Sequence, residues 1–173
     1  MKNVMKMGAA LLALLLSGTA GATCNANVVI TKPDNIYVDH GNGTVTDKDT
    51  GLMWMQCSQG LSGAGCATGA ATAMNWKQAL EAVQTANSGA GTFGYTDWRL
   101  PNAVELLSLA EQACYSPAIN TTLFPATVSD GYWTSSPLAS GGDSAWIVNF
   151  DGGEETSSYK SSSLYVRLVR GGQ

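Results

Sequence analysis

The chain has 173 residues, 13% of them charged, and a formal net charge of −4 at pH 7. This length fits one domain. An acidic chain with nine Lys and Arg residues is a poor partner for nucleic acid or for an anionic membrane surface. After residue 22, no stretch is apolar enough to span a bilayer. Composition therefore argues against nucleic-acid-binding and membrane-spanning proteins.

The first 22 residues have the three parts of a secretory signal peptide. Lys2 and Lys6 supply positive charge, and residues 7–16 form an apolar run about half as long as a spanning helix. Ala20-Gly21-Ala22 fits the small-x-small cleavage rule. The sequence therefore predicts export, to the periplasm, the cell surface or the medium. Cleavage after Ala22 would leave 7 Lys and Arg against 13 Asp and Glu, a net charge of −6.

Four cysteines follow the predicted cleavage site: Cys24, Cys57, Cys66 and Cys114. An even number in an exported chain implies disulfides, and four cysteines allow three pairings. We favour Cys57–Cys66, because a Gly-rich loop of eight residues joins them and bends freely. Cys24–Cys114 is then the second pair, and it would tie the N-terminal arm to the domain. Zinc is disfavoured, because there is a single histidine and no Cys-x-x-Cys pair.

The first half of the chain is read as an arm, residues 23–36, followed by the start of a domain that covers residues 37–173. In the domain, two β-prone runs flank His40-Gly41-Asn42-Gly43, and the Asn-Gly pair favours a hairpin turn. The segment 58–72 is rich in Gly, Ala, Ser and Thr and is predicted to be a loop. The predicted strands of this half cover residues 28–30, 37–39, 44–46 and 52–56.

Two helices are predicted in the middle of the chain. The first covers residues 73–86, and its apolar face includes Leu80 and Val83 at helical spacing. The second begins after Asn102, where Glu105 three residues later completes a capping-box pattern. The apolar residues that follow predict that the second helix is buried.

The segment Asp97-Trp98-Arg99-Leu100-Pro101 joins the two helices. Pro101 favours an extended residue before it and a helix start after it, and Arg99 lies within reach of Glu105. We interpret the segment as structural. The tryptophans have apolar neighbours, so core packing is the expected role of most of them. They are Trp54, Trp76, Trp98, Trp133 and Trp146.

The last third of the chain is predicted to be β. The predicted strands cover residues 132–135, 145–150 and 164–169, and the predicted loops cover residues 137–144 and 151–163. Strands come first, two helices follow, and strands end the chain. This order predicts an α+β fold in which two helices pack on mainly antiparallel sheets stapled by disulfides.

No enzyme template fits the sequence, and we predict no catalytic residue. A Ser-His-Asp or Cys-His arrangement needs a histidine, and His40 lies in a predicted turn. A glycosidase needs two carboxylates across one sugar bond. The late acidic residues supply carboxylates, but acidic side chains in surface loops are mostly solvated.

Calcium is the one cofactor with any pattern in the sequence. Asp39, Asn42, Asp47 and Asp49 place oxygen donors close together, and residues 151–155 are a second weak candidate. The first group does not fit the EF-hand loop. Asp, Asn and Gly are also the ordinary residues of tight turns. We therefore expect turns rather than a metal site.

Several motifs occur together in one order. They are DHGNGTVTDKDTGLMW at residues 39–54, Trp76-x-x-Ala79, Asp97 to Pro101 with Glu105-Leu106, Tyr132-Trp133-Thr134-Ser135-Ser136, and Val166-Arg167-Leu168-Val169-Arg170. From about Tyr37 to Arg170 this set resembles the Lcl C-terminal domain family, named for the adhesin domain of a bacterial collagen-like protein. The resemblance implies that the tryptophans, the Asp97–Glu105 segment and Arg167 are structural.

The resemblance also implies a C-type-lectin-like fold. More distantly, the chain is similar to the formylglycine-generating-enzyme fold. The late copper-binding cysteine pair of that enzyme has no counterpart here, since Cys114 is the last cysteine. The founding adhesin binds sulfated polysaccharide of host surfaces. Sulfate recognition calls for clustered Arg and Lys, which this chain lacks. The resemblance therefore implies the fold rather than this ligand.

We expect an exported, non-catalytic binding or adhesion module that recognises carbohydrate or protein through its late loops. The candidate ligand residues are Asp143, Asp151, Glu154, Glu155 and Tyr159. One alternative is a structural subunit of a surface or pilus-type assembly, which would expose an apolar patch. The other is an enzyme, either a glycoside hydrolase or a formylglycine-generating-like oxidoreductase.

Overall fold

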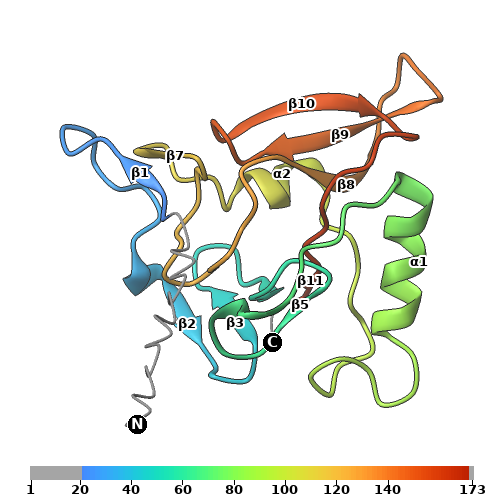
Figure 1. Ribbon diagram of the computed structural model, residues 1–173, viewed down its shortest axis with the longest axis horizontal. Helices are drawn as coiled ribbons and strands as arrows, with labels where there is room; N and C mark the ends of the chain where they lie inside the picture. The colour runs from blue at the N-terminus through green and yellow to red at the C-terminus, as the bar shows by residue number, and fades with distance from the viewer. Residues whose placement is uncertain (1–20, 172–173) are drawn as a thin grey trace, which may run out of the picture.

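A four-stranded antiparallel sheet forms around the hairpin turn that the Asn-Gly pair predicts (Figure 1). The computed structural model describes residues 21–171, so the predicted signal peptide up to residue 20 lies outside the described residues. The strands are β2 (Tyr37–Asp39), β3 (Thr44–Asp47), β4 (Met53–Met55) and β11 (Val169–Arg170), in the order β11-β4-β3-β2. Gly41 and Gly43 have φ angles of 67° and 93°, which the turn requires. The predicted hairpin is confirmed.

A second, three-stranded antiparallel sheet contains the late acidic residues. Its strands are β8 (Gly131–Pro137), β9 (Ser144–Asn149) and β10 (Glu154–Tyr159), in the order β10-β9-β8. The prediction of a loop over residues 151–163 is wrong, because β10 lies within it. The side chains of this edge strand are exposed along most of its length. A strand without a buried face has no apolar alternation to predict it.

The predicted last strand, residues 164–169, is wrong for most of its length. At its end, Val169 and Arg170 pair with β4 of the first sheet. At its start, Tyr165 makes a single bridge with Tyr132 of the second sheet. The segment therefore crosses from one sheet to the other, and its residues 166–168 are fully buried. Its apolar alternation reflects burial between the sheets instead of continuous strand pairing.

The second helix, α2 (Ala103–Leu107), begins as predicted. Asn102 accepts the backbone N–H of Glu105, and the Glu105 side chain accepts the N–H of Asn102, which completes the capping box. Leu106 is fully buried, and α2 lies against β8 and β9. In residues 21–171, no helix has the length and apolarity needed to cross a membrane.

The first helix, α1 (Trp76–Ala86), starts three residues after the predicted position because Asn75 caps it. Its buried residues are Ala79 and Ala86, whereas Leu80 is 38% exposed. The prediction that Leu80 belongs to the apolar face is therefore wrong. The two small alanine side chains let the helix approach the core closely. A hydrophobicity scale ranks Leu above Ala as a buried residue, so it does not predict this close approach.

The Gly-rich segment 58–72, predicted to be a loop, contains a small antiparallel hairpin. Its elements are β5 (Leu61–Ser62), a 3-10 turn (Ala64–Cys66) and β6 (Thr68–Gly69). Its pairing is too short to leave a periodic pattern in the sequence.

The N-terminal arm is joined to the domain by a strand and a disulfide. β1 (Thr23–Cys24) pairs with β7 (Cys114–Tyr115), and the predicted Cys24–Cys114 bond is confirmed. The predicted strand at residues 28–30 is wrong: these residues are exposed and lie outside any strand. Their β-branched side chains favour extended backbone, but no neighbouring strand supplies hydrogen bonds. A 3-10 turn, Asp34–Ile36, then leads into β2.

Glu111 is the second anchor of the arm. This side chain is 2% exposed. Its carboxylate accepts the backbone N–H groups of Thr31, Lys32 and Ala113, and Thr31 also donates its hydroxyl. Burial alone would raise the pKa of Glu111, but these hydrogen bonds together hold the pKa below its ordinary value. The ionised carboxylate therefore stabilises the folded arm.

We predict that Glu111→Gln lowers the free energy of unfolding by about 2 kcal/mol at pH 7, since hydrogen bonds to a charged group are lost. Because the folded-state pKa is depressed, this contribution is present above the unfolded pKa of about 4.3 and fades as pH falls through the folded value. Urea unfolding of both proteins at pH 7 and pH 3 checks this. A gap that stays the same at pH 3 would contradict it.

Most of the tryptophans lie in the core, as predicted. Trp54, Trp98 and Trp133 are at most 1% exposed. Trp76 and Trp146 are half-buried. The indole N–H groups of Trp98 and Trp133 each donate to a backbone carbonyl, at 2.9 and 2.8 Å. Buried indoles with satisfied donors favour a structural role.

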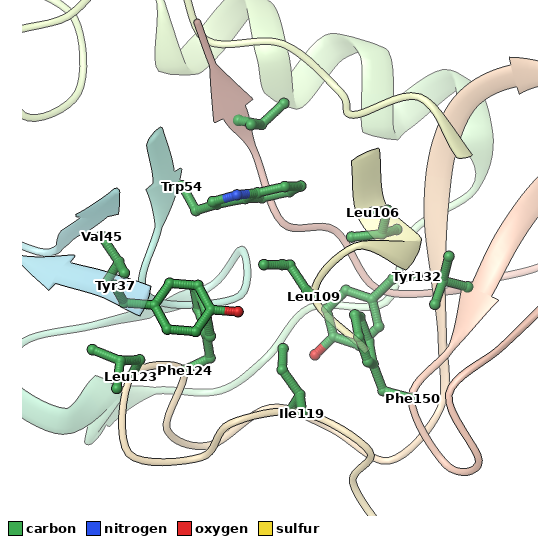
Figure 2. Packing of buried hydrophobic residues seen from close by; sticks show 12 residues of the cluster. Tyr37, Val45, Trp54, Leu106, Leu109, Ile119, Leu123, Phe124, Tyr132 and Phe150 are labelled. Carbon is green, nitrogen blue, oxygen red and sulfur yellow. The ribbon is translucent and has the colours of Figure 1, made fainter. Parts of the chain in front are cut away.

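Aromatic pairs from both sheets meet in one buried cluster (Figure 2). Tyr37 of β2 packs edge-on against Phe124, with ring centroids 5.5 Å apart. Tyr132 of β8 packs in the same way against Phe150, at 5.1 Å. Leu109, drawn between the two pairs in Figure 2, belongs to the same cluster. The two sheets therefore share a core that holds the surface loops on a rigid base.

Candidate functional site

The five predicted ligand residues do not form one site. Asp143 and Tyr159 lie at one end of the β9–β10 hairpin. Asp151, Glu154 and Glu155 lie at its other end. Five residue steps of strand separate the two ends, about 17 Å at the rise of an extended chain. A single sugar ring is too short to reach both groups.

Asp151 is occupied by contacts within the protein. Its Oδ1 accepts the hydroxyls of Ser116 and Ser129, each at 2.7 Å. These two hydrogen bonds lower the pKa of Asp151 below its ordinary value. The carboxylate therefore joins the loop after β7 and the loop before β8 to the β9–β10 turn.

The oxygen donors considered for calcium build turns. Oδ1 of Asp39, Asn42 and Asp47 each accepts a backbone N–H two residues further along the chain, at 2.8 to 3.1 Å. Among residues 21–171, no three Asp, Glu, His or Cys side chains gather as a metal ion would need. His40 is exposed, and its Nε2 lies 2.9 Å from Thr46 Oγ1.

A cleft of about 1040 Å³ opens beside the first sheet. Its sides are the β2–β3 turn at residues 39–43, the disulfide-closed segment 57–65, and the second half of α1 with Phe93. None of the five predicted ligand residues lines it. The sequence signal that points here is the Gly-rich segment closed by its own cysteine pair, which the sequence predicts to be a loop.

The disulfide-closed segment forms a firm wall of this cleft. Cys57 and Cys66 are bonded as predicted. The backbone N–H of Thr72 donates to the carbonyl of Gln59 at 2.9 Å. At Gly60, where φ is 92°, an added Cβ would lie 2.3 Å from the carbonyl oxygen of Ala70. The two sides of the hairpin can approach this closely because Gly60 has no side chain at the point of contact.

Arg167 supports the floor of the cleft from below. It is 0% exposed, and its Nη1 donates to the carbonyls of Met55 and Gln56. Its Nη2 donates to Thr127 Oγ1 at 2.7 Å and more weakly to Ser58 Oγ. Within residues 21–171, its Nε has no hydrogen-bond partner. Burial lowers the pKa of Arg167 to about 10, so it keeps its charge at pH 7.

Phe93 supplies an aromatic surface to the cleft. It is 43% exposed and has a φ of 56°, a conformation that costs a bulky residue about 1 to 3 kcal/mol. The Phe93 ring is supported on one side, because it packs edge-on against Trp98 with ring centroids 6.4 Å apart. An added Cβ at Gly43 would lie 2.6 Å from the ring. A strained backbone that holds an aromatic half in solvent favours ligand contact over core packing.

Neutral polar side chains make up part of the remaining lining, beside glycines and apolar residues. The lining residues with side-chain amides or hydroxyls include Asn42, Gln56, Gln59, Ser62 and Thr85. Among the described residues that line it, Asp39 alone carries a charge. The arrangement suits binding of a neutral polar ligand.

The segment between the helices is held by ion pairs outside the cleft. Arg99 donates to both oxygens of Glu105, each at 2.7 Å, as predicted. Arg170 Nε donates to Asp97 Oδ1 at 2.7 Å. The hydrogen bond from each arginine lowers the pKa of its carboxyl partner. These contacts fasten the segment to β11 and α2 and support its structural interpretation.

Comparison with known proteins identifies a family. No curated protein matches the chain. The Lcl C-terminal domain family matches residues 43–170, which cover the disulfide-closed wall of the cleft, Phe93 and Arg167. The match includes most of the chain and agrees with the motifs found in the sequence. The chain therefore belongs to the Lcl C-terminal domain family.

Proposed function

We propose that the chain is an exported, non-catalytic module that binds carbohydrate in the cleft beside the Cys57–Cys66 disulfide. The observation that carries this proposal is the lining of the cleft, which combines neutral amide and hydroxyl side chains with apolar residues, among them one half-exposed aromatic ring, in a volume of about 1040 Å³. A volume of this size fits a ligand site. The proposal moves the site away from the β9–β10 hairpin that the sequence favoured.

The lining matches the chemistry of a sugar. Sugar hydroxyls both donate and accept hydrogen bonds, and side-chain amides do the same. Asn42 Oδ1 accepts hydrogen bonds from the backbone N–H and the hydroxyl of Thr44. Within residues 21–171, Asn42 Nδ2 and the side-chain amide of Gln56 make no hydrogen bond, so these groups are free for a ligand. The apolar face of a sugar ring can pack on Phe93.

Export and a C-type-lectin-like fold are parts of the same proposal. Two disulfides favour an oxidising compartment, and the described residues contain no free cysteine. The mixed fold with antiparallel sheets and short helices is compatible with a lectin-like scaffold. In scaffolds of this kind, ligands bind to loops that a rigid base holds in place.

We predict that Phe93→Ala raises the Kd for carbohydrate at least tenfold, because the aromatic contact in the cleft is lost. A glycan array of neutral oligosaccharides identifies a probe, and calorimetry with that probe measures both proteins. Phe93→Trp should keep the Kd within about threefold, since it restores an aromatic face. Thermal unfolding confirms that each variant is folded.

Tyr159→Ala is the matched control for Phe93→Ala. Tyr159 is a more exposed aromatic, 69%, and lies on β10 outside the cleft. Its removal should leave the Kd unchanged. A blank array with folded protein, or equal losses in the two variants, would argue against the cleft as a carbohydrate site.

One observation favours a structural subunit as the second candidate function. Val28, Val29 and Ile30 are 42%, 84% and 44% exposed in succession on the N-terminal arm. Consecutive exposed apolar residues are a mark of contact with another chain. Light scattering of the purified protein separates the candidates. An assembly that Val29→Asp dissolves would favour the subunit, whereas a monodisperse monomer would favour the binding module.

A further inference from the structure

We infer that the cleft discriminates against anionic sugars, so its ligand is an uncharged, unsulfated carbohydrate. This inference rests on the proposed function and adds the ligand class to it. The cleft can form an ion pair with a sulfate only if it offers a cation. The charges of the described residues decide whether it does.

The side chains around the cleft carry negative charge only. Asp39, at the end of β2, is exposed and lines the cleft. Its Oδ1 accepts the N–H of Gly41, which holds the carboxylate at the turn. No Lys or Arg of the described chain lines the cleft. A sulfate in the cleft would meet a carboxylate and no counter-charge.

The cations of the domain are held elsewhere. Four of them contact partners outside the cleft lining: Lys77 with Glu81, Lys160 with the Trp76 ring, Arg99 with Glu105, and Arg170 with Asp97. Two more, Lys32 and Lys48, lie on the arm and in the turn after β3 and do not line the cleft. A sulfated ligand therefore gains no ion pair from these side chains.

Arg167 is the cation beneath the floor, and it is closed to a ligand. Its side chain is fully buried and is not part of the cleft lining. Both terminal nitrogens already donate to protein oxygens, including the carbonyls of Met55 and Gln56. A sulfate oxygen has no route to the guanidinium.

The size of the effect follows from Coulomb's law. One sulfate about 5 Å from the Asp39 carboxylate in water is repelled enough to weaken binding about fourfold. A ligand with several sulfates multiplies this factor, and the overall negative charge of the domain adds to it. Because Asp39 is exposed, salt screens the repulsion, and the discrimination should shrink as ionic strength rises.

The experiment uses carbohydrates that differ in sulfation. The pairs are dextran with dextran sulfate, and cellohexaose with chemically sulfated cellohexaose. Calorimetry at low ionic strength is expected to show at least tenfold weaker binding of the sulfated member of whichever pair binds. Asp39→Asn should improve sulfated binding about fourfold. Asp143→Asn removes the same charge from an exposed site outside the cleft and should change neither Kd.

The outcomes separate this inference from the function on which it rests. Stronger or equal binding of the sulfated member overturns the inference and leaves the carbohydrate-binding function standing. Equal effects of Asp39→Asn and Asp143→Asn overturn the role of Asp39, because overall charge would then explain the discrimination. No binding to any member of either pair, together with a blank glycan array, overturns both.

Discussion

Replacing Cys24 and Cys114 together by serine is expected to lower the free energy of unfolding by about 4.6 kcal/mol, as the loop-entropy relation gives for a crosslink across about 90 residues. The bond joins residues that face each other in the β1–β7 pair, 90 positions apart in the chain. Opening it frees a long segment of the unfolded chain. Urea unfolding at 25 °C measures the loss.

The other disulfide is the matched control. Cys57 and Cys66 are 9 positions apart, and the same relation gives about 2.7 kcal/mol for their replacement by serine. Their loss should instead affect the cleft, because the closed segment is its wall. We therefore expect the Cys24/Cys114 variant to lose more stability, and the Cys57/Cys66 variant to lose more carbohydrate affinity. A reversed order in either measurement would contradict the separate roles.

Arg167→Ala is expected to lower the free energy of unfolding by about 3 to 5 kcal/mol, from unpaired buried acceptors and a new cavity. The carbonyls of Met55 and Gln56 and the hydroxyl of Thr127 lose their donor. The guanidinium also packs over the Phe124 ring, 4.9 Å from its centroid. Removing a buried charge recovers part of the loss, since burial already lowers the pKa of Arg167 to about 10.

Two further variants test whether hydrogen bonds or charge explain the effect of Arg167. Arg167→Lys keeps the charge but loses the planar fork that reaches acceptors on two sides. Arg167→Met keeps much of the volume and loses every donor. Both should be destabilised by about 2 kcal/mol or more in denaturant unfolding. A Met variant as stable as the parent would show that the hydrogen bonds of Arg167 contribute no net stability.

Local features were predictable because their physics is local. The capping box at Asn102 and Glu105 depends on residues three apart, and the structure confirms it. The turn at Gly43 depends on the backbone freedom of one or two residues. The two disulfides followed from loop length and from the small number of pairings. The Arg99–Glu105 pair follows from a separation of six residues at a helix start.

Errors arose wherever pairing or burial depends on distant parts of the chain. β10 has polar, exposed side chains, so its pairing with β9 leaves no apolar pattern. Residues 164–169 alternate like a strand but cross between two sheets. Leu80 looked like a core residue, yet the smaller Ala79 fits the close helix contact.

The sequence by itself determined the family, the disulfide pairs, the hairpin turn and the structural role of the segment between the helices. The tertiary structure decided where the cleft lies. The late acidic residues are neighbours in sequence, but strand geometry holds them at opposite ends of one hairpin. The cleft draws its lining from residues 39–43, 55–65, 82–93 and 122–125. No local pattern links such distant segments, because folding alone brings them together around a buried arginine and a disulfide.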